Sequence, residues 1–537
     1  MLEKIQQFRG KRFYLLTLSV LSGALLSLSW YFPFTLLAFI ALVPLLELEN
    51  QIYEGDYKWP KLTFWLYALV SMTLWNIGVI WWLWNASGFA TLGAWGANAV
   101  LQTFPLILFQ LTKRASNDKF GFIPFVVFWV AFEYVHLNWD LSWVWLNLGN
   151  VFANVPAWVQ WYEYIGSFGG TIWILIANVL AYRALLLGRS KLNVALCIIF
   201  PMVVSYILYF SYEETGKDIE AVVVQPNLDC YTEKFSYNAK TGQRNQTSHV
   251  PYKEQLNRLI SLSEEKMTDK TQFVLWPETA MHQTLNAAIP FQYNDFRKAD
   301  SLIKRHPNAR LISGISTIEQ YKDPSEHTIT TRHHKSLGYY DVFGSAAFFT
   351  GTPSFEIYHK SKLVIGVETI PFPSVLRSLI MDFGGSSGGL GSQKEREVFF
   401  NQEEGAAPVI CYESVYGDFM TEYVQKGATF IAIVTNDGWW GNTSGHRQHM
   451  NYARLRAIEL RRAVARSANT GVSGFINQRG DIIQESKYDE MIALNGTIKS
   501  NNELTLYAQI GDIIGRLAAF LAPFLVLSAF VRKKVRG

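Results

Sequence analysis

Charged residues are scarce in this 537-residue chain, and two long stretches have none. Asp, Glu, Lys and Arg make up 17% of the residues, against about 25% in soluble domains. Residues 13–46 and 62–112 contain no charged side chain. By contrast, residues 211–502 have an ordinary soluble composition. The chain therefore combines a membrane part with a globular part that is large enough to have its own core.

Cysteines and long basic runs are also rare, and each shortage argues against a class of protein. The three cysteines, Cys197, Cys230 and Cys411, show no CxxC spacing, so neither a disulfide framework nor a zinc site is indicated. The net charge is only +4, and the globular part has no long run of Lys or Arg. Nucleic-acid binding therefore has little support.

Histidines do not form a convincing set of metal ligands. His446 and His449 are three residues apart on an expected helix, where surface or packing positions are the ordinary explanation. His333 and His334 lie in a polar stretch without a neighbouring carboxylate. We therefore predict no metal site.

Eight apolar stretches approach the length that crosses a membrane. They cover residues 13–29, 32–47, 61–83, 88–111, 120–136, 165–187, 192–210 and 509–531. The fifth is the weakest, because Glu133 and His136 lie near its end. Residues 141–162 are rich in Trp, Asn and Gly, which predicts an interfacial segment because Trp favours the headgroup level.

Basic residues gather at alternate ends of these stretches and predict their orientation. They are Lys4, Arg9, Lys11, Arg12, Lys113, Arg114, Arg183, Arg189, Lys191, Arg532, Lys533, Lys534 and Arg536. Eight spans put all of them on one side, which the positive-inside rule makes cytoplasmic. Seven spans precede the globular part, so it falls on the non-cytoplasmic face. We predict a membrane domain over residues 1–212, a globular domain over 213–503, and a C-terminal span with a basic tail over 504–537.

Short apolar strings alternate with helical patterns in the globular part, which predicts an α/β layered core. Strands are expected at 219–226, 272–276, 310–314, 346–349, 408–411 and 429–435. Helices are expected at 255–266, 291–305, 419–426 and 446–468. A glycine-rich stretch over 381–393 lacks the residue order of a P-loop and predicts a mobile loop.

A carboxylate, an amine and a thiol stand beside apolar strings of this domain. Glu278 follows one string, Lys360 precedes another, and Cys411 ends a third. Alone, each has an ordinary explanation, as a solvated loop glutamate, a surface lysine and a core cysteine. Together they are the groups that covalent acyl transfer needs, and strand ends are where α/β sheets carry their sites.

The strings that carry these groups resemble those of a known superfamily. Trp276-Pro277-Glu278, Tyr358-His359-Lys360 and Cys411-Tyr412-Glu413 are similar to the Glu–Lys–Cys triad strings of the nitrilase, or carbon-nitrogen hydrolase, superfamily. With its spans, the whole chain resembles the bacterial apolipoprotein N-acyltransferase family. Further matches are Val224-Gln225-Pro226-Asn227, residues 435–441 and residues 456–480. The resemblance implies a multi-pass helical membrane domain carrying a nitrilase-like αββα sandwich, with residues 213–503 as the catalytic domain.

This resemblance implies a ping-pong acyl transfer without a cofactor or metal. Cys411 would attack the sn-1 ester of a phospholipid, typically phosphatidylethanolamine, to give a thioester and a lysophospholipid. The α-amine of a diacylglyceryl-cysteine at a lipoprotein N-terminus would then take the acyl chain. Glu278 would be the general base, and Lys360 would stabilise both oxyanions. The implied location is the bacterial inner membrane, with the catalytic domain on the periplasmic face.

The resemblance also implies residues around this triad. Supporting roles fall on Glu368, Glu413 and Tyr412, and substrate binding falls on Trp439, Trp440 and Phe235. The chain departs from the usual pattern at two of these places. Phe235 stands where the family often has Trp, and residues 363–368 read Leu-Val-Ile-Gly-Val-Glu where Leu-Val-Pro-Phe-Gly-Glu is usual.

Two other functions remain open at this point. A membrane-tethered amidase of the nitrilase type would use the same triad with water as acceptor, although a soluble amide substrate would not need a site held at the bilayer. A transporter with an accessory domain would need ionisable residues inside its spans, and the first four expected spans have essentially none.

Overall fold

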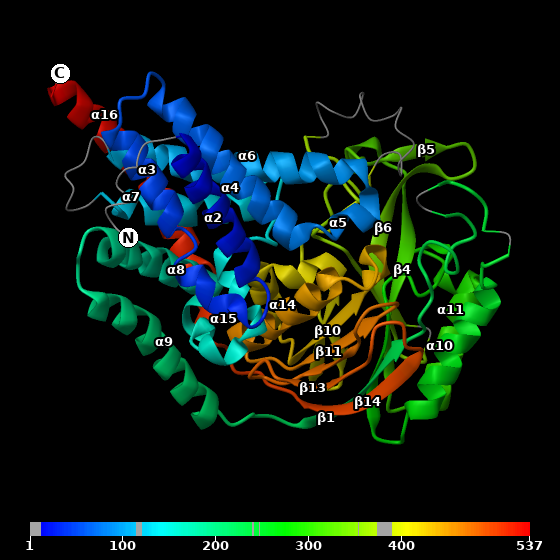
Figure 1. The fold of residues 1–537 in the computed structure, drawn as a ribbon. Coiled ribbons are helices and arrows are strands. Elements are labelled where there is room, and N and C mark those ends of the chain that lie inside the picture. The colour runs from blue at the N-terminus through cyan, green and yellow to red at the C-terminus, as the bar shows by residue number, and fades with distance from the viewer. Residues whose placement is uncertain are drawn as a thin grey trace. The chain divides into compact units, whose positions relative to one another are not determined.

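The computed structural model describes residues 12–113, 121–238, 241–245, 247–352, 354–372 and 389–536. Most of the glycine-rich stretch predicted over 381–393 lies outside these residues. The chain divides into two compact units, Met1–Ser211 with Ile510–Gly537, and Tyr212–Gln509. The first is helical and the second contains both sheets and helices (Figure 1). This confirms the expected fold class, a multi-pass helical part that carries an α/β domain.

The helical unit is built from α-helices joined by short connections. Its α-helices are α2 (Arg12–Ser29), α3 (Val43–Glu54), α4 (Pro60–Ile80), α5 (Leu83–Ser87), α6 (Phe89–Lys113), α7 (Ile123–Leu137), α8 (Tyr162–Leu186), α9 (Lys191–Ser211) and α16 (Ile513–Arg536). Its 3-10 helices are η1 (Phe34–Phe39), η3 (Leu148–Asn154) and η4 (Pro156–Trp158).

Seven helical stretches in the described part of the chain are long and apolar enough to cross a membrane. They are Arg12–Ser29, Phe34–Glu54, Pro60–Ile80, Phe89–Lys113, Tyr162–Leu186, Lys191–Ser211 and Ile513–Arg532. The remaining predicted span corresponds to α7, which is apolar but has only 15 residues. The count of about eight is therefore approximately right, and the span expected to be weakest is the short one.

Glu133, one of the two ionisable residues that weakened the fifth expected span, is buried and accepts three hydrogen bonds. Glu133 of α7 accepts hydrogen bonds from Trp129 Nε1 at 3.0 Å, from the Leu148 amide at 2.8 Å and from Thr171 Oγ1 at 2.7 Å. A buried carboxylate without such donors would be strongly destabilising. Glu133 therefore joins α7 to η3 and α8 and stabilises the packing of the bundle.

The Trp-rich segment over residues 141–162 packs into the helical unit. It contains η3 and η4, and its Trp145 is only 1% exposed. The rings of Trp145 and Trp82 lie 5.0 Å apart between centroids. Trp145 is therefore buried by packing against other side chains of the helical unit.

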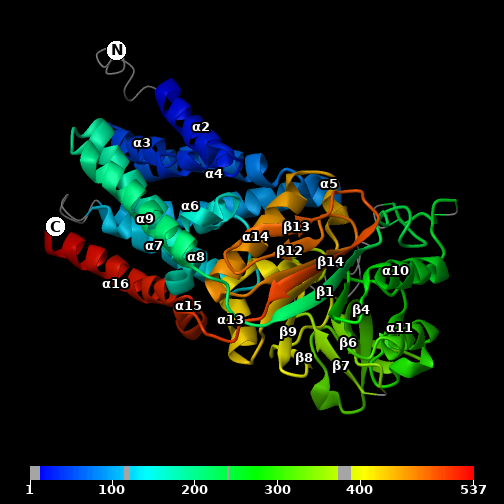
Figure 2. The same cartoon turned by 90° about the horizontal axis from the view of Figure 1, so that it is seen from below.

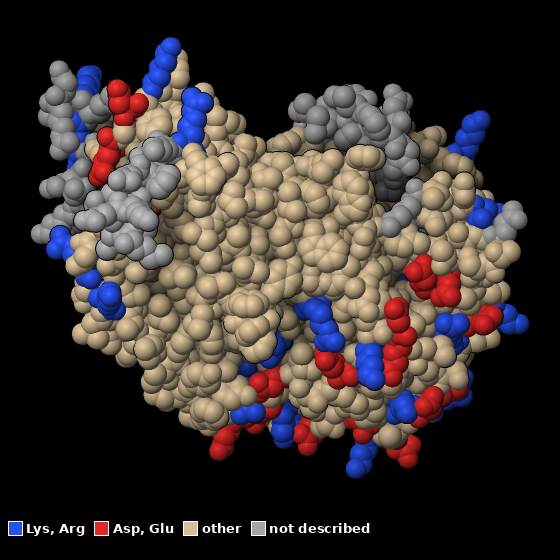
Figure 3. All heavy atoms as spheres, in the orientation of Figure 1, with Lys and Arg blue, Asp and Glu red and all other residues tan. Residues whose placement is uncertain are grey.

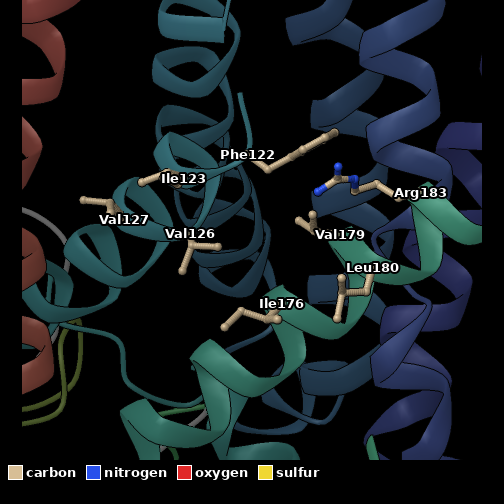
Figure 4. Close-up of a pocket in the computed structure, with 8 residues that line it drawn as sticks. All are labelled: Phe122, Ile123, Val126, Val127, Ile176, Val179, Leu180 and Arg183. Carbon is tan, nitrogen blue, oxygen red and sulfur yellow. The ribbon is translucent and has the colours of Figure 1, made fainter. Parts of the chain in front are cut away.

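The surface of the helical unit has the character of a membrane protein. Figure 3 shows charged side chains gathered over the α/β unit and at the helix ends, with a broad uncharged surface over α2, α4 and α6. A pocket of about 330 Å³ lies between α7 and α8 (Figure 4). All but one of its lining residues are apolar: Phe122, Ile123, Val126, Val127, Ile176, Val179, Leu180 and Arg183.

The α/β unit contains two sheets. The first has the order β14-β1-β2-β4-β6-β5, with β3 beside β4 and β7 beside β6, and the second has the order β13-β12-β11-β10-β9-β8. The strands are β1 (Asp218–Gln225), β2 (Thr271–Trp276), β3 (Thr284–Asn286), β4 (Arg310–Tyr321), β5 (Arg332–His334), β6 (Gly338–Phe349), β7 (Phe355–His359), β8 (Phe399–Asn401), β9 (Glu404–Ile410), β10 (Phe430–Thr435), β11 (Val464–Ala468), β12 (Gly474–Ile476), β13 (Ile482–Glu485) and β14 (Ile492–Lys499).

Helices cover the outer faces of the two sheets. The helices of this unit are α10 (Tyr252–Lys266), α11 (Asn294–Arg305), α13 (Gly417–Gln425), α14 (Ser444–Leu460) and α15 (Leu506–Ile510), with the 3-10 helices η5 (Pro290–Gln292), η6 (Pro324–Glu326), η7 (Cys411–Val415) and η8 (Asp437–Trp440). The first sheet carries α10 and α11, and the second carries α14 with α13 beside it (Figure 2). The inner faces meet, as where the rings of Phe273 and Phe430 lie 4.8 Å apart. The result is the predicted αββα sandwich.

The central strands of both sheets are parallel and buried. β1, β2 and β4 run parallel in the first sheet, and β9, β10 and β11 do so in the second. Parallel strands that are covered on both faces have nearly continuous apolar sequences. That is why the strings at 219–226, 272–276 and 429–435 could be recognised as strands from the sequence.

The prediction of one helix over 446–468 is wrong in its second part. α14 ends at Leu460, and Arg461 adopts a left-handed conformation with φ of +47°. The chain then returns as β11, which pairs in parallel with β10. The pairing gained in the sheet outweighs the helical propensity of this Ala- and Arg-rich segment. The prediction that Cys411 belongs to a strand is also wrong, because β9 ends at Ile410 and Cys411 begins η7.

Candidate active site

The carboxylate, the amine and the thiol each lie within two residues of the end of a strand. Glu278 comes after β2, where Pro277 cannot continue the hydrogen-bonded ladder because it has no N–H. Lys360 comes directly after β7, and Cys411 directly after β9. The prediction that Glu278 and Cys411 lie at or just past strand ends is confirmed.

Cys411 is held in a strained backbone conformation at the start of η7. Its φ is +50°, a region that non-glycine residues rarely adopt, and its side chain is 8% exposed. Such a conformation costs about 1–3 kcal/mol and persists where the surroundings impose it. Burial raises the pKa of the thiol, as does Glu278, while Lys360 opposes the rise. The cysteine is therefore a neutral thiol at neutral pH and needs a base in order to react.

Lys360 is buried between two carboxylates. Its Nζ lies 2.8 Å from Glu368 Oε1 and 3.1 Å from Glu278 Oε1, and the lysine is 1% exposed. Burial lowers the pKa of this amine, but the charges of Glu278 and Glu368 raise it by more, so the net pKa lies well above the usual value. Cys411 also interacts electrostatically with the ammonium. The site thus contains a permanent cation beside the base candidate and the thiol.

The turn that departs from the family pattern still brings Glu368 to the lysine. Within it, Gly366 has φ of +80°, and its amide donates to the Thr369 carbonyl at 2.7 Å. Glu368 Oε2 accepts a hydrogen bond from the Val364 amide at 2.8 Å. This second bond fixes the carboxylate while its other oxygen contacts Lys360. The changed residues therefore alter the sequence of the turn without removing the contact.

Glu413 ties the lysine segment to the cysteine segment. Its side chain is fully buried, and its Oε1 accepts from the Ser361 amide at 2.6 Å and from Tyr358 Oη at 2.7 Å. Its Oε2 accepts from the Ile410 amide at 2.8 Å. Burial raises the pKa of Glu413, and these donors oppose the rise. Tyr412, which precedes it, is 5% exposed.

A buried network behind Cys411 was not foreseen from the sequence. Asp437 Oδ2 accepts from Arg466 Nη2 at 2.7 Å, and its Oδ1 lies 3.0 Å from His449 Nδ1. His449 Nε2 in turn lies 3.2 Å from the Cys411 carbonyl and 3.0 Å from Ser414 Oγ. Burial raises the pKa of Asp437, but Arg466 and His449 lower it by more, so it remains ionised. His449 is thus a buried packing residue that also supports the backbone of the cysteine turn.

Two of the three predicted substrate-binding aromatics lie together. The rings of Phe235 and Trp439 stack with centroids 6.3 Å apart and planes 13° apart. Tyr231 Oη donates to the Trp439 carbonyl at 2.9 Å. Trp440 instead contacts the ring of His449, at 5.6 Å between centroids. The structure thus groups Phe235 with Trp439, while Trp440 belongs to the network behind the cysteine.

Metal ligands do not cluster in the part of the chain that the structure describes. There, no group of three or more His, Cys, Asp and Glu residues could hold an ion. His333 and His334 lie on β5, and His446 Nε2 lies 3.1 Å from Asn442 Oδ1.

The Glu278 segment approaches β4 so closely that only glycine fits at position 314 of that strand. We expect Gly314→Ala to reduce the turnover rate about 10²-fold. A Cβ at Gly314 would lie 2.5 Å from Glu278 Cα and 2.6 Å from the Pro277 carbonyl. The carboxylate must then move, and misplacement by about 1 Å can cost about 10² in rate. Steady-state turnover and a thermal unfolding curve measure the change.

Gly344→Ala is the matched control, on the neighbouring strand β6. A Cβ there would meet its nearest atom at 3.8 Å, an ordinary contact. We expect this variant to stay within about threefold of the wild type. Equal turnover of Gly314→Ala and Gly344→Ala would show that the close approach at Gly314 does not position Glu278.

Two family models match this chain, one in each unit. The model of the apolipoprotein N-acyltransferase N-terminal domain matches residues 22–180, and the carbon-nitrogen hydrolase model matches residues 246–501. An apolipoprotein N-acyltransferase from Chlorobaculum tepidum is 27% identical over 543 residues, which cover 96% of this chain and 97% of the relative. The chain is therefore similar to apolipoprotein N-acyltransferases over nearly its full length. A second relative, from Geobacter metallireducens, is 24% identical over 98% of this chain and 96% of its own length.

A solved structure of the nitrilase superfamily gives a weaker similarity. Saccharomyces cerevisiae Nit3 is 13% identical, with a TM-score of 0.38, and the match covers 56% of this chain and 96% of Nit3. A score this low adds nothing to the assignment, which depends on the family models and the full-length relatives. The resemblance to the apolipoprotein N-acyltransferase family, inferred from the three short strings and the spans, is confirmed.

Proposed function

We propose that this protein is a phospholipid:apolipoprotein N-acyltransferase of a bacterial inner membrane, with its α/β unit on the periplasmic face. It transfers an acyl chain through a thioester on Cys411 to the N-terminal amine of diacylglyceryl-cysteine in lipoproteins. The observation that carries the proposal is the buried ion pair of Lys360 and Glu278, in electrostatic contact with the Cys411 thiol, in a chain similar to apolipoprotein N-acyltransferases. Phosphatidylethanolamine is the expected donor.

In the first half-reaction, Glu278 takes the proton of the Cys411 thiol and the thiolate attacks the ester carbonyl of the phospholipid. The raised pKa of the thiol supports the need for this base. Lys360 stabilises the oxyanion of the tetrahedral intermediate, because its ammonium is buried, charged and already oriented by Glu368. The C–O bond then breaks, and the lysophospholipid oxygen leaves with the proton from Glu278. Cys411 is left as a thioester.

In the second half-reaction, the lipoprotein amine attacks the thioester carbonyl. Glu278 removes a proton from the attacking nitrogen, and Lys360 again stabilises the oxyanion. The C–S bond breaks, an amide forms, and the thiolate of Cys411 regains its proton from Glu278. The number of protons and the charge of the site are the same at the end as at the start.

The route of the chain supports a lipid substrate over a soluble one. The α/β unit begins at Tyr212, directly after the apolar helix α9, and ends at Gln509, shortly before the apolar helix α16. It is therefore connected to membrane-spanning helices at both of its ends. The basic residues Arg183, Arg189 and Lys191, at or between the ends of α8 and α9, support a cytoplasmic loop there, and hence a periplasmic α/β unit.

A two-product assay tests the proposal against hydrolysis. The purified full-length protein in phospholipid nanodiscs receives phosphatidylethanolamine and a peptide with an N-terminal diacylglyceryl-cysteine. We expect N-acylated peptide and lysophospholipid in equal amounts, with little free fatty acid. Free fatty acid with no acylated peptide would identify water as the acceptor and contradict the transferase.

A further inference from the structure

A second buried lysine contacts the segment that carries Glu278. Lys234 is 2% exposed, and its Nζ donates a hydrogen bond to the Glu278 carbonyl at 3.0 Å. Lysine is almost never this deeply buried without a partner. The two residues are 44 positions apart in the sequence. The contact is therefore a tertiary one, and it is made to the backbone of the residue proposed as general base.

The backbone of Lys234 is itself fixed at two points. Its amide donates to the Asp229 carbonyl at 2.9 Å, and its carbonyl accepts from Gln255 Nε2 at 2.8 Å. Gln255 lies on α10 and is 4% exposed. Phe235 follows directly, and its ring centroid lies 5.9 Å from Lys234 Nζ. A rigidly held amine thus connects the Glu278 segment with an aromatic residue expected to bind substrate.

The amine of Lys234 is positively charged at neutral pH. Burial lowers its pKa to about 8, and the charges of Glu278 and Cys230 oppose the decrease. Since this value lies above 7, the ammonium form predominates at neutral pH. Glu278 is therefore flanked by two buried cations, Lys234 at its carbonyl and Lys360 at its carboxylate.

We propose that Lys234 is a positioning residue of the acyl transfer, whose ammonium fixes the Glu278 backbone and stabilises the ionised carboxylate. This inference depends on the proposed function, because it assigns Lys234 to the base of that reaction. The charges of Lys234 and Glu278 attract each other. Lys234 therefore favours the resting carboxylate that accepts the proton of the thiol.

Removal of this charge has a consequence that depends on pH. Lys360, Lys234 and Cys411 interact electrostatically with Glu278, and Lys234 also interacts with Cys230. Loss of this cation removes an attraction that favours the ionised carboxylate of the base. We therefore expect the acidic limb of the pH–rate profile to move to higher pH.

The test measures acyl-thioester formation on Cys411 as a function of pH in the full-length protein with phosphatidylethanolamine alone. Lys234→Met keeps the length of the side chain and removes its charge. We expect the acidic limb to move to higher pH and the rate at pH 7 to fall by about tenfold. Lys304→Met is the control, because Lys304 is 54% exposed and pairs with Asp300 of the same helix, α11. We expect its profile to match that of the wild type.

Lys234→Arg separates the charge from the fit of the side chain. This variant keeps the cation, so its acidic limb should stay at the wild-type position even if the larger group lowers the rate. The Lys234→Arg profile still tests the inference if Lys234→Met does not fold. The inference would be overturned if Lys234→Met lost rate equally at all pH values with no shift of the acidic limb. It would also be overturned if the acidic limb of Lys234→Arg shifted. Wild-type thioester formation with an unshifted Lys234→Met profile would reject only the role of Lys234. No thioester in the wild type would reject the proposed function as well.

Discussion

Replacing Lys360 with methionine is expected to lower acyl-thioester formation by at least about 10²–10³, the usual cost of removing one oxyanion donor. The ammonium is the buried cation between Glu278 and Glu368, and it carries its charge at all physiological pH values. Methionine has a similar length but cannot donate a hydrogen bond or offset a negative charge. The oxyanion then forms beside two carboxylates without the positive charge of Lys360. Single-turnover kinetics with phosphatidylethanolamine measure the loss.

The control for this substitution is Lys426→Met. Lys426 pairs with Glu422 and Glu395 at a position that is 38% exposed, and exposed ion pairs contribute about 0–1 kcal/mol. Its loss should leave thioester formation unchanged. If Lys360→Met unfolds no more readily than the wild type and still forms thioester at a near-normal rate, Lys360 does not stabilise the oxyanion.

Glu413→Gln is expected to lower the free energy of unfolding by about 3 kcal/mol and to reduce activity strongly. The carboxylate accepts hydrogen bonds from the Ser361 and Ile410 amides and from Tyr358 Oη, all in the protein interior. An amide side chain has only one acceptor oxygen, so one backbone N–H would face an NH₂ group instead. Each hydrogen bond to a charged group contributes about 1.5–3 kcal/mol, and an unpaired buried donor costs a similar amount.

Chemical unfolding in detergent measures the stability of this variant. Glu485→Gln is the matched control, since Glu485 pairs with Arg447 near the surface and such substitutions usually change stability by less than about 0.5 kcal/mol. Equal stability of the two variants would show that the hydrogen bonds of Glu413 do not hold the lysine and cysteine segments together.

The residues that the sequence could identify are those that stand next to a recognisable strand. Glu278 and Cys411 each follow a continuous apolar string, and both strings form buried parallel strands. Lys360 was found by its motif, because β7 has mixed burial and no clear apolar pattern. The spans were predictable for the same reason as the strands, since long uncharged stretches have few structural alternatives.

The residues that the sequence could not identify depend on contacts between distant segments. His449 reaches the Cys411 carbonyl across 38 positions, and Lys234 reaches Glu278 across 44. Nothing near either residue in the sequence indicates its partner. The end of α14 was missed for a related reason, because the left-handed turn at Arg461 is favoured by the pairing of β11 with β10 and not by local propensity.

The most direct test of the account is mass spectrometry of the peptide that contains Cys411, after incubation of the purified protein with phosphatidylethanolamine and no acceptor. We expect an acyl adduct on this peptide that hydroxylamine removes, that is lost in Cys411→Ala and that persists in Cys197→Ala, whose cysteine lies on α9. A missing adduct, or one that remains in Cys411→Ala, would contradict the central claim that Cys411 is the nucleophile.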